Sequence, residues 1–242
     1  MKKYLLLALA GVALGFVNLS QAQVTLLVSA DTYLTNDPDS LPTEAHGTEE
    51  LMELRLLPDV RTRVLYFQFD LSQVTGDLSG ATITLNATQI LKTRVLDFYG
   101  VVDGAVGGQG ENWDENTLSY SDAAGFEATF AGAVATTAEL TSILAEMGVN
   151  KDVLGDYSTD TSTEMDAFLA ADTNGLVTFA SIYPGPDGTA QFFTTKENTV
   201  AGAALAARLY LPNATAVPEP ATIALLLGGM SLLLVLYRRR TR

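Results

Sequence analysis

Short segments of β-strand character, separated by turn-forming residues, occupy most of this chain. In 81–91, the apolar residues Ile83, Leu85 and Ala87 alternate with polar ones, which predicts a strand with one buried face. In 63–69, apolar side chains occur in both phases of the alternation, which predicts a central strand covered on both faces. The same criteria predict strands over 24–28, 51–57, 95–102, 117–120, 176–183, 190–194 and 207–211.

Two further segments, 137–147 and 161–171, have apolar residues at helical spacing. In the first, these residues are Leu140, Ile143, Leu144 and Met147. The second has Asp160 or Thr161 as its expected N-cap. Many strands with few helices predict an all-β fold, a jelly-roll β-sandwich in which two short helices cover an end.

The first 22 residues have the three parts of a secretory signal peptide. Lys2 and Lys3 precede an apolar run over 4–17, which ends in the small-residue exit Ser20-Gln21-Ala22. The export machinery recognises and removes such a segment, so we expect a signal helix that is cleaved after Ala22. A buried N-terminal helix is the alternative.

The C-terminal segment, 214–242, combines an apolar stretch with a basic end. The stretch 221–237 is at the lower limit of the roughly 17 to 25 residues that cross a bilayer, which predicts a transmembrane helix. The basic cluster after it would stay on the cytoplasmic side. The residues that flank the stretch are Pro218, Glu219 and Pro220 before it, and Arg238, Arg239 and Arg240 after it.

This order of a Pro-Glu-Pro triplet, an apolar span and an arginine cluster resembles the PEP-CTERM sorting signal of Gram-negative bacteria. The resemblance covers the last 25 residues. It implies an exosortase-type protease that recognises the triplet, removes the tail and passes the protein from the inner membrane to the cell surface or extracellular matrix. A plain tail anchor is the alternative.

The body between these two ends is strongly acidic and has no cysteine. Without the six basic residues and the one acidic residue of the ends, eight Lys and Arg face 27 Asp and Glu, a formal charge of −19. Such a surface repels the phosphates of nucleic acids, which excludes DNA and RNA as partners. The absence of cysteine excludes disulfides and thiolate chemistry.

Several segments of the body resemble, in their order, the DNRLRE-type domain of secreted polysaccharide-active proteins. They include Ala30-Asp31-Thr32-Tyr33, the stretch 61–72, Asn112-Trp113-Asp114-Glu115 and Thr195-Lys196-Glu197. The resemblance spans 24–212 and implies a jelly roll that binds polysaccharides, among them uronic-acid polymers such as alginate. Where the family commonly has Ser-Arg-Glu, this chain has Thr195-Lys196-Glu197, and lysine lacks the bidentate fork of arginine.

An enzymatic function has little support in the residues. His46 is the only histidine, and it lies in an acidic loop near a proline. Such a loop is expected to form a turn and not the active site of a Ser-His-Asp triad. Glu111, Asp114 and Glu115 flank Trp113, the only tryptophan, in a pattern that a glycosidase would also have. Trp113 would stack on a sugar ring, or else fill the end of the sandwich.

Two further kinds of site are expected in the body. Structural calcium is the only cofactor that the residues suggest, with Asp31 and Asp70 at strand edges as ligands. Basic side chains on neighbouring strands would bind an acidic glycan, or would be paired with nearby acids. The basic residues expected to bind a glycan are Arg61, Arg63, Arg94 and Lys196.

The sequence thus predicts a signal peptide over 1–22, one β-sandwich domain over 23–213 and a sorting tail over 214–242. The expected function is that of an exported, non-catalytic module that binds an acidic polysaccharide at the cell surface. A purely structural protein of the surface or biofilm matrix is the first alternative, and a polysaccharide lyase or glycosidase is the second.

Overall fold

The computed structural model of the chain describes residues 23–36, 43–57, 61–106, 108–126, 139–182 and 188–217. The predicted signal peptide, the triplet 218–220, the apolar stretch and the arginine cluster lie outside these residues. Within them, no helix is both long enough and apolar enough to cross a membrane. The elements are β1 (Val24–Leu27), β2 (Ala30–Thr35), β3 (Leu51–Leu57), β4 (Arg61–Asp70), β5 (Val74–Gly76), β6 (Thr82–Ile90), β7 (Arg94–Val101), β8 (Leu140–Val149), β9 (Gly155–Ser158), α2 (Thr163–Ala171), β10 (Leu176–Ile182), β11 (Gln191–Thr194), β12 (Arg208–Leu211) and β13 (Ala214–Ala216).

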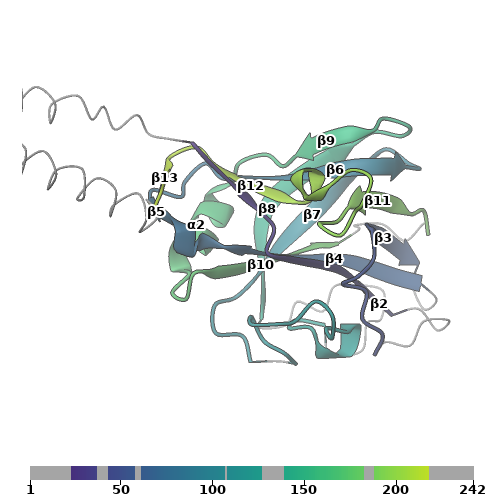
Figure 1. Cartoon of the computed structure of the whole chain (residues 1–242), viewed down its shortest axis with the longest axis horizontal. Helices are drawn as coiled ribbons and strands as arrows, with labels where there is room; N and C mark the ends of the chain where they lie inside the picture. Colours follow the sequence, from purple (N-terminus) through teal and green to yellow (C-terminus); the bar gives the residue numbers. More distant parts are fainter. Residues whose placement is uncertain are drawn as a thin grey trace, which may run out of the picture.

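Antiparallel pairing joins most of these strands into one curled sheet (Figure 1). Its order is β1-β12-β6-β11-β3-β4-β10-β7-β8, with β2 beside β4 and β9 beside β6. Strand β3 belongs to both halves, because its first residues pair with β11 and its last residues pair with β4. The sheet therefore folds over at β3, and its two halves face each other as expected for an all-β sandwich.

The main hydrophobic core lies between the two halves. One half contributes Leu54, Ile83 and Phe193, and the other contributes Phe67 and Phe179 among its fully buried side chains. Phe67 and Phe179 lie on paired positions of β4 and β10, with ring centroids 6.0 Å apart. The core contains inward-facing residues of both halves, which alternate along their strands with residues of the outer faces. This is the usual way to build the core of a sandwich.

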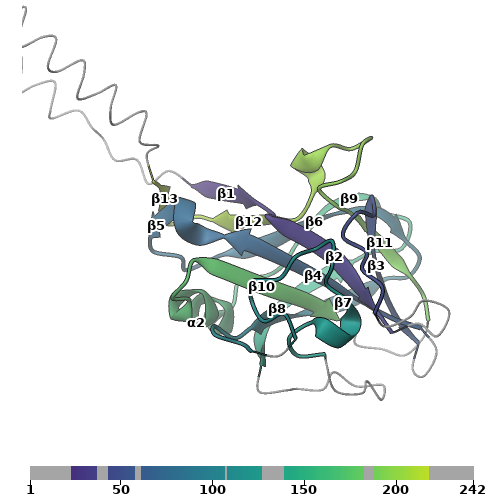
Figure 2. The same ribbon diagram turned by 60° about the horizontal axis from the view of Figure 1, so that its bottom comes forward.

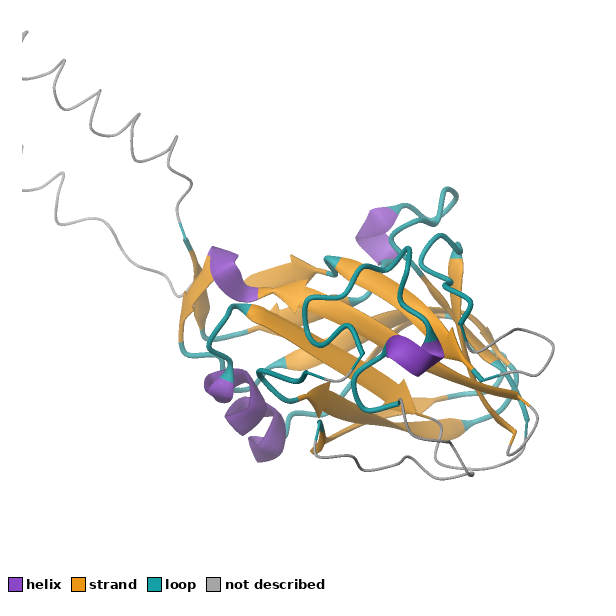
Figure 3. Cartoon of the chain, turned by 90° about the horizontal axis from the view of Figure 1, so that it is seen from below, coloured by secondary structure: helices purple, strands orange, loops and turns teal. Residues whose placement is uncertain are grey.

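Strand β4 is buried on both faces, which confirms the prediction from its sequence. Its inward residues belong to the main core, while Val64 and Tyr66 belong to a second cluster on the outer face. Loops and a short 3-10 helix from residues 102–106 and 108–126 cross this outer face and cover it (Figure 3). Trp113 is the largest side chain of this cover, and its ring lies 5.2 Å from that of Tyr66.

The helix predicted over 137–147 is wrong, because its described part belongs to strand β8. Pairing with β7 is interrupted between Asp97 and Tyr99, where β8 carries extra residues, and exposed Leu144 has φ 47° in this bulge. Near the bulge, two residues instead of one separate buried Leu140 from buried Ile143, after which strict alternation resumes. A strand with this interruption has apolar residues at the same spacing as a helix.

The second predicted helix is confirmed as α2, with a different N-cap. Ser162 precedes the helix, and its side chain accepts a hydrogen bond from the backbone N–H of Met165. Met165 and Leu169 enter the main core at one end of the sandwich. The strand predicted over 117–120 is wrong, because this segment forms a turn that leads into a 3-10 helix over Tyr120–Asp122.

The first and last described strands meet at the end of the sandwich where α2 also lies (Figure 2). Val24 of β1 is paired with Leu211, which closely precedes β13. Strand β13 pairs with β5 in a separate two-stranded sheet. The folded domain therefore continues to residue 217, beyond the boundary at 213 that the sequence predicts. Strands β3, β9 and β11 extend to the opposite end (Figure 1).

Candidate functional site

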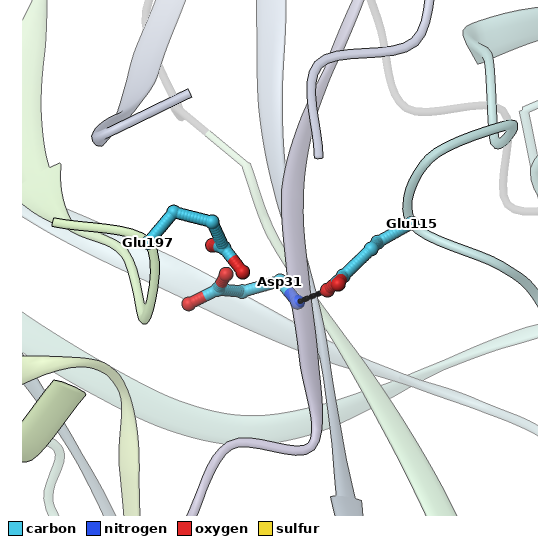
Figure 4. Close-up of side chains that lie close together, drawn as sticks. All are labelled: Asp31, Glu115 and Glu197. Atoms are coloured by element: carbon cyan, nitrogen blue, oxygen red, sulfur yellow. Dashed lines mark hydrogen bonds between the residues drawn. The ribbon is translucent and has the colours of Figure 1, made fainter. Parts of the chain in front are cut away.

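Three carboxylates from distant parts of the chain meet beside strand β2. Asp31, Glu115 and Glu197 each place a carboxylate oxygen within 4.8 Å of the others. In Figure 4, the carboxylates of Asp31 and Glu197 face each other, and Glu115 accepts a hydrogen bond of 3.2 Å from the backbone N–H of Asp31. We call these three residues the acidic cluster. Asp31 is completely buried, and the other two are partly buried.

The loop of residues 108–119, which carries Trp113 over the outer face of β4 and is here called the covering loop, fixes the position of Glu115. Trp113 donates a hydrogen bond of 3.1 Å from its indole N–H to Thr178 on β10, which holds the loop against the sheet. On the other side, Gly47 packs against the backbone of Glu115. A Cβ atom at Gly47 would lie only 2.1 Å from the Glu115 carbonyl oxygen. Glycine at this position therefore allows the loop to approach β2 closely.

The turn after β11 fixes the position of Glu197. The Thr195 hydroxyl donates a 2.7 Å hydrogen bond to the carbonyl of Glu49, and the Asn198 amide donates one of 3.0 Å to the carbonyl of Glu50. These bonds tie the turn to the loop that precedes β3. Asp31 needs no loop to position it, since it is paired with Phe67 in the ladder between β2 and β4.

Lys196 lies within the acidic cluster and neutralises part of its charge. Its backbone N–H donates a 3.0 Å hydrogen bond to Asp31 Oδ2. Its ammonium Nζ is 2.6 Å from Glu115 Oε1 and 3.3 Å from Glu197 Oε1. Burial opposes ionisation of this lysine, but the two glutamates outweigh burial and raise the pKa of Lys196. One ammonium among three carboxylates leaves a formal charge of −2 when all are ionised.

Two oxygens of the acidic cluster have no donor. Asp31 Oδ1 and Glu197 Oε2 are buried, and no hydrogen-bond donor of the described residues reaches either of them. Burial, followed by the negative charge of Glu197, raises the pKa of Asp31 to about 8. In the absence of a cation, the Asp31 carboxyl group would therefore keep a proton at neutral pH.

Two of the basic residues expected to bind a glycan form ion pairs with carboxylates. Arg63 forms an ion pair with Glu53 and lies over the ring of Tyr33, 5.4 Å from its centroid. Glu53 is also 3.2 Å from Arg55. Lys196 is part of the acidic cluster. Arg61 is the first residue of β4, and Arg94 is the first residue of β7.

The two remaining predicted ligands have structural roles. Asp70 does not join Asp31 but caps a 3-10 helix, where its Oδ1 accepts a 2.8 Å hydrogen bond from the backbone N–H of Ser72. Trp113 is 5% exposed, so its ring is not available to stack on a sugar. The sequence also allowed Trp113 to be a packing residue, and the structure places it over the outer face of the sheet.

The acids around Trp113 belong to three different environments. Glu115 is in the acidic cluster, and Asp114 accepts hydrogen bonds from Asn116 in an exposed turn. Glu111 accepts hydrogen bonds from Gly104 and Asn174 on the other side of the loop, and burial raises its pKa. The structure therefore does not bring these acids together as a pair.

His46 is stacked on Tyr33, with ring centroids 4.2 Å apart and an angle of 16° between the rings. Burial lowers the pKa of His46, which favours its neutral form. Its Nε2 atom has no hydrogen-bond partner among the described residues. The ring therefore packs as a neutral aromatic beside Arg63.

A groove that the sequence did not predict crosses the outer face of β6, β11 and β3. It consists of two clefts of about 500 and 440 Å³ that share Leu51 and Phe192. Phe192 is paired with Gln89 on one side and Glu53 on the other, so these three side chains lie side by side across the strands. The residues that line the groove are Tyr33, Thr48, Glu49, Glu50, Leu51, Glu53, Thr88, Gln89, Ile90, Leu91, Asp152, Leu154, Phe192 and Asn198.

A scan against protein-family models finds no match for the chain, and a search of curated proteins finds no similar sequence.

Proposed function

We propose that this protein is an exported, non-catalytic surface module that binds a polysaccharide in the groove across β6, β11 and β3. The observation that carries the proposal is the position of Phe192. Its partly exposed ring lies at the junction of the two clefts, between polar Gln89 and Glu53. A flat apolar ring beside hydrogen-bonding groups suits a sugar, which has both an apolar face and hydroxyl groups at its edge.

The shape of the groove favours a chain over a single sugar. The two clefts adjoin, and each has a volume within the usual range of a ligand pocket. Exposed Leu91 and Leu154 line one cleft, and Tyr33 and Asn198 line the other. Apolar surface therefore adjoins Phe192 in the first cleft, and mainly polar groups with the ring of Tyr33 adjoin it in the second, so successive sugar units would meet both kinds of surface.

The charge of the groove favours a neutral polysaccharide over the acidic one that the sequence led us to expect. Carboxylates line it, namely those of Glu49, Glu50 and Asp152, whereas Glu53 is buried and forms ion pairs with Arg55 and Arg63. The described lining residues include no lysine and no arginine. Arg63 lies nearby, but its charge is paired with Glu53. A uronic-acid chain would thus meet like charges, whereas carboxylates accept hydrogen bonds from the hydroxyls of a neutral sugar.

The proposal includes the setting that the sequence indicates. The body would be a DNRLRE-like jelly roll, carried across the inner membrane by its signal peptide. The PEP-CTERM tail would then hold it until an exosortase-type protease passes it to the cell surface or matrix of a Gram-negative bacterium. The curled antiparallel sheet and the pairing of β3 with both halves support a jelly roll.

The test compares Phe192→Ala with the wild type in binding to a panel of neutral and acidic polysaccharides, using the full chain in a mild detergent. We expect saturable binding to a neutral glycan and at least a tenfold loss in Phe192→Ala, because burying a phenyl ring contributes about 1.5–3 kcal/mol. Tyr210→Ala is the matched control, since Tyr210 is a partly exposed aromatic residue of β12 outside the groove.

Three other outcomes would each contradict a different part of the proposal. Binding to acidic glycans alone would overturn the assignment of a neutral ligand. An equal loss in both variants would place the glycan outside the groove. Absence of binding to any glycan by a folded wild-type protein would favour the purely structural surface protein.

A further inference from the structure

We propose that the acidic cluster of Asp31, Glu115 and Glu197 is a binding site for a divalent cation, with Ca²⁺ as its ligand. The unpartnered oxygens carry this inference. Asp31 is 0% exposed, and its Oδ1 has no donor among the described residues. Glu197 Oε2 is buried without a donor as well. A buried carboxylate oxygen without a partner is costly, and a bound cation would satisfy both atoms at once.

The contacts of Lys196 with the acidic cluster leave one carboxylate oxygen of each residue available to a cation. Lys196 Nζ contacts the Oε1 atoms of Glu115 and Glu197, and the Lys196 backbone N–H contacts Asp31 Oδ2. The oxygens without these contacts are Asp31 Oδ1, Glu197 Oε2 and Glu115 Oε2, the last of which accepts the N–H of Asp31. Each residue therefore offers one oxygen that Lys196 does not occupy.

The charge of the cluster matches a divalent ion. Three carboxylates and the ammonium of Lys196 sum to −2, so a divalent cation would make the buried group neutral. A monovalent ion would leave a net charge in a largely buried place, which is unfavourable. The oxygen-only donor set suits a hard cation, and the lack of cysteine and of a nearby histidine ligand disfavours zinc.

The arrangement suits Ca²⁺ better than Mg²⁺. The three carboxylates come from a strand and two loops and supply only part of a coordination shell. Ca²⁺ accepts six to eight oxygens in irregular geometry, whereas Mg²⁺ demands near-ideal octahedral geometry. Water would supply the remaining ligands of Ca²⁺. A bound ion would fasten the covering loop and the turn after β11 to strand β2.

Thermal unfolding of the full chain in detergent, with Ca²⁺ added after EDTA treatment and dialysis, tests the proposal without reference to glycan binding. We expect a saturable rise in Tm of about 5–10 °C when Ca²⁺ exceeds its Kd a hundredfold. Asp31→Asn and Glu197→Gln should abolish most of this rise. Glu146→Gln, which removes an exposed carboxylate of β8, should retain it and thereby separate site binding from general screening of an acidic protein.

A second measurement uses Tb³⁺, which replaces Ca²⁺ and emits when a nearby tryptophan is excited. Trp113 is two residues from Glu115, so we expect sensitised emission that Ca²⁺ displaces and that Asp31→Asn loses. Equal Ca²⁺ responses of Tm in the wild type and in both cluster variants would overturn the proposal, as would the lack of any saturable response. Stabilisation by Mg²⁺ at lower concentrations than Ca²⁺ would overturn the choice of ion.

Discussion

Replacing Asp31 by asparagine should change how the stability of the protein depends on pH when EDTA removes divalent cations. Burial and the facing Glu197 raise the pKa of Asp31 from 3.8 to about 8. The folded protein therefore keeps a proton on Asp31 that the unfolded chain releases above pH 4. The stabilisation from this proton is complete below pH 4 and is lost as the pH rises towards 8. The Asp31→Asn variant has no such proton to lose.

The size of the effect follows from the width of this pH window. Within it, each pH unit lowers the free energy of unfolding of the wild type by about 1.4 kcal/mol relative to the variant. Between pH 5 and pH 7, the wild type should thus lose about 3 kcal/mol relative to Asp31→Asn. The amide of the variant would also donate a hydrogen bond to Glu197, in place of the proton of the Asp31 carboxyl group.

Urea unfolding of both full-length proteins at pH 5, 6 and 7, in detergent with EDTA, measures this difference. Glu164→Gln, which removes an exposed carboxylate of α2, is the control, and its stability relative to the wild type should stay constant over this range. A difference between Asp31→Asn and the wild type that changes by less than 1 kcal/mol would refute the argument. It would mean that Lys196 alone keeps Asp31 ionised in the folded protein.

Two further substitutions test an element of the fold and the support of the acidic cluster. Ser162→Ala should lower the stability of the protein by about 1 kcal/mol, measured by urea unfolding, because it removes the N-cap of α2. Exposed Thr163→Ala should have a smaller effect, and equal effects would contradict the capping role. Gly47→Ala should lower Tm and weaken the Ca²⁺ response, since the added methyl group would push the loop of Glu115 away from β2. Gly148→Ala is its control, as an added Cβ has no neighbour within 4 Å there, and an unchanged Ca²⁺ response in Gly47→Ala would contradict this role for Gly47.

The alternation of apolar and polar residues predicted the strands in which no bulge interrupts that alternation. Strand β4 is an example, because apolar residues in both phases of its alternation do enter two separate cores. Strand β8 shows where such patterns fail. Its bulge at Leu144 shifts the phase of the alternation, and the resulting spacing imitates a helix.

The acidic cluster was only partly predictable, because it depends on contacts between distant segments. Asp31 was expected to bind calcium, but its neighbours Glu115 and Lys196 are 84 and 165 residues away in the chain. Asp70, its expected partner, is held locally by Ser72. The groove was not predicted either, since Phe192 becomes a surface residue between two polar neighbours only through the pairing of β11 with β3 and β6.

The place where the chain leaves the domain determines how the molecule would respond to mechanical force. The groove lies on β3, β6 and β11, and these strands extend towards the end of the sandwich opposite β13, the last described strand before the proposed sorting tail (Figure 1). Tension between a bound glycan and a tethered tail would therefore run along the whole sandwich and reach β13. This strand pairs with β5 through only three residues. Under tension it would detach first and lengthen the tether by about 10 Å, while the larger sheet and the groove stay intact.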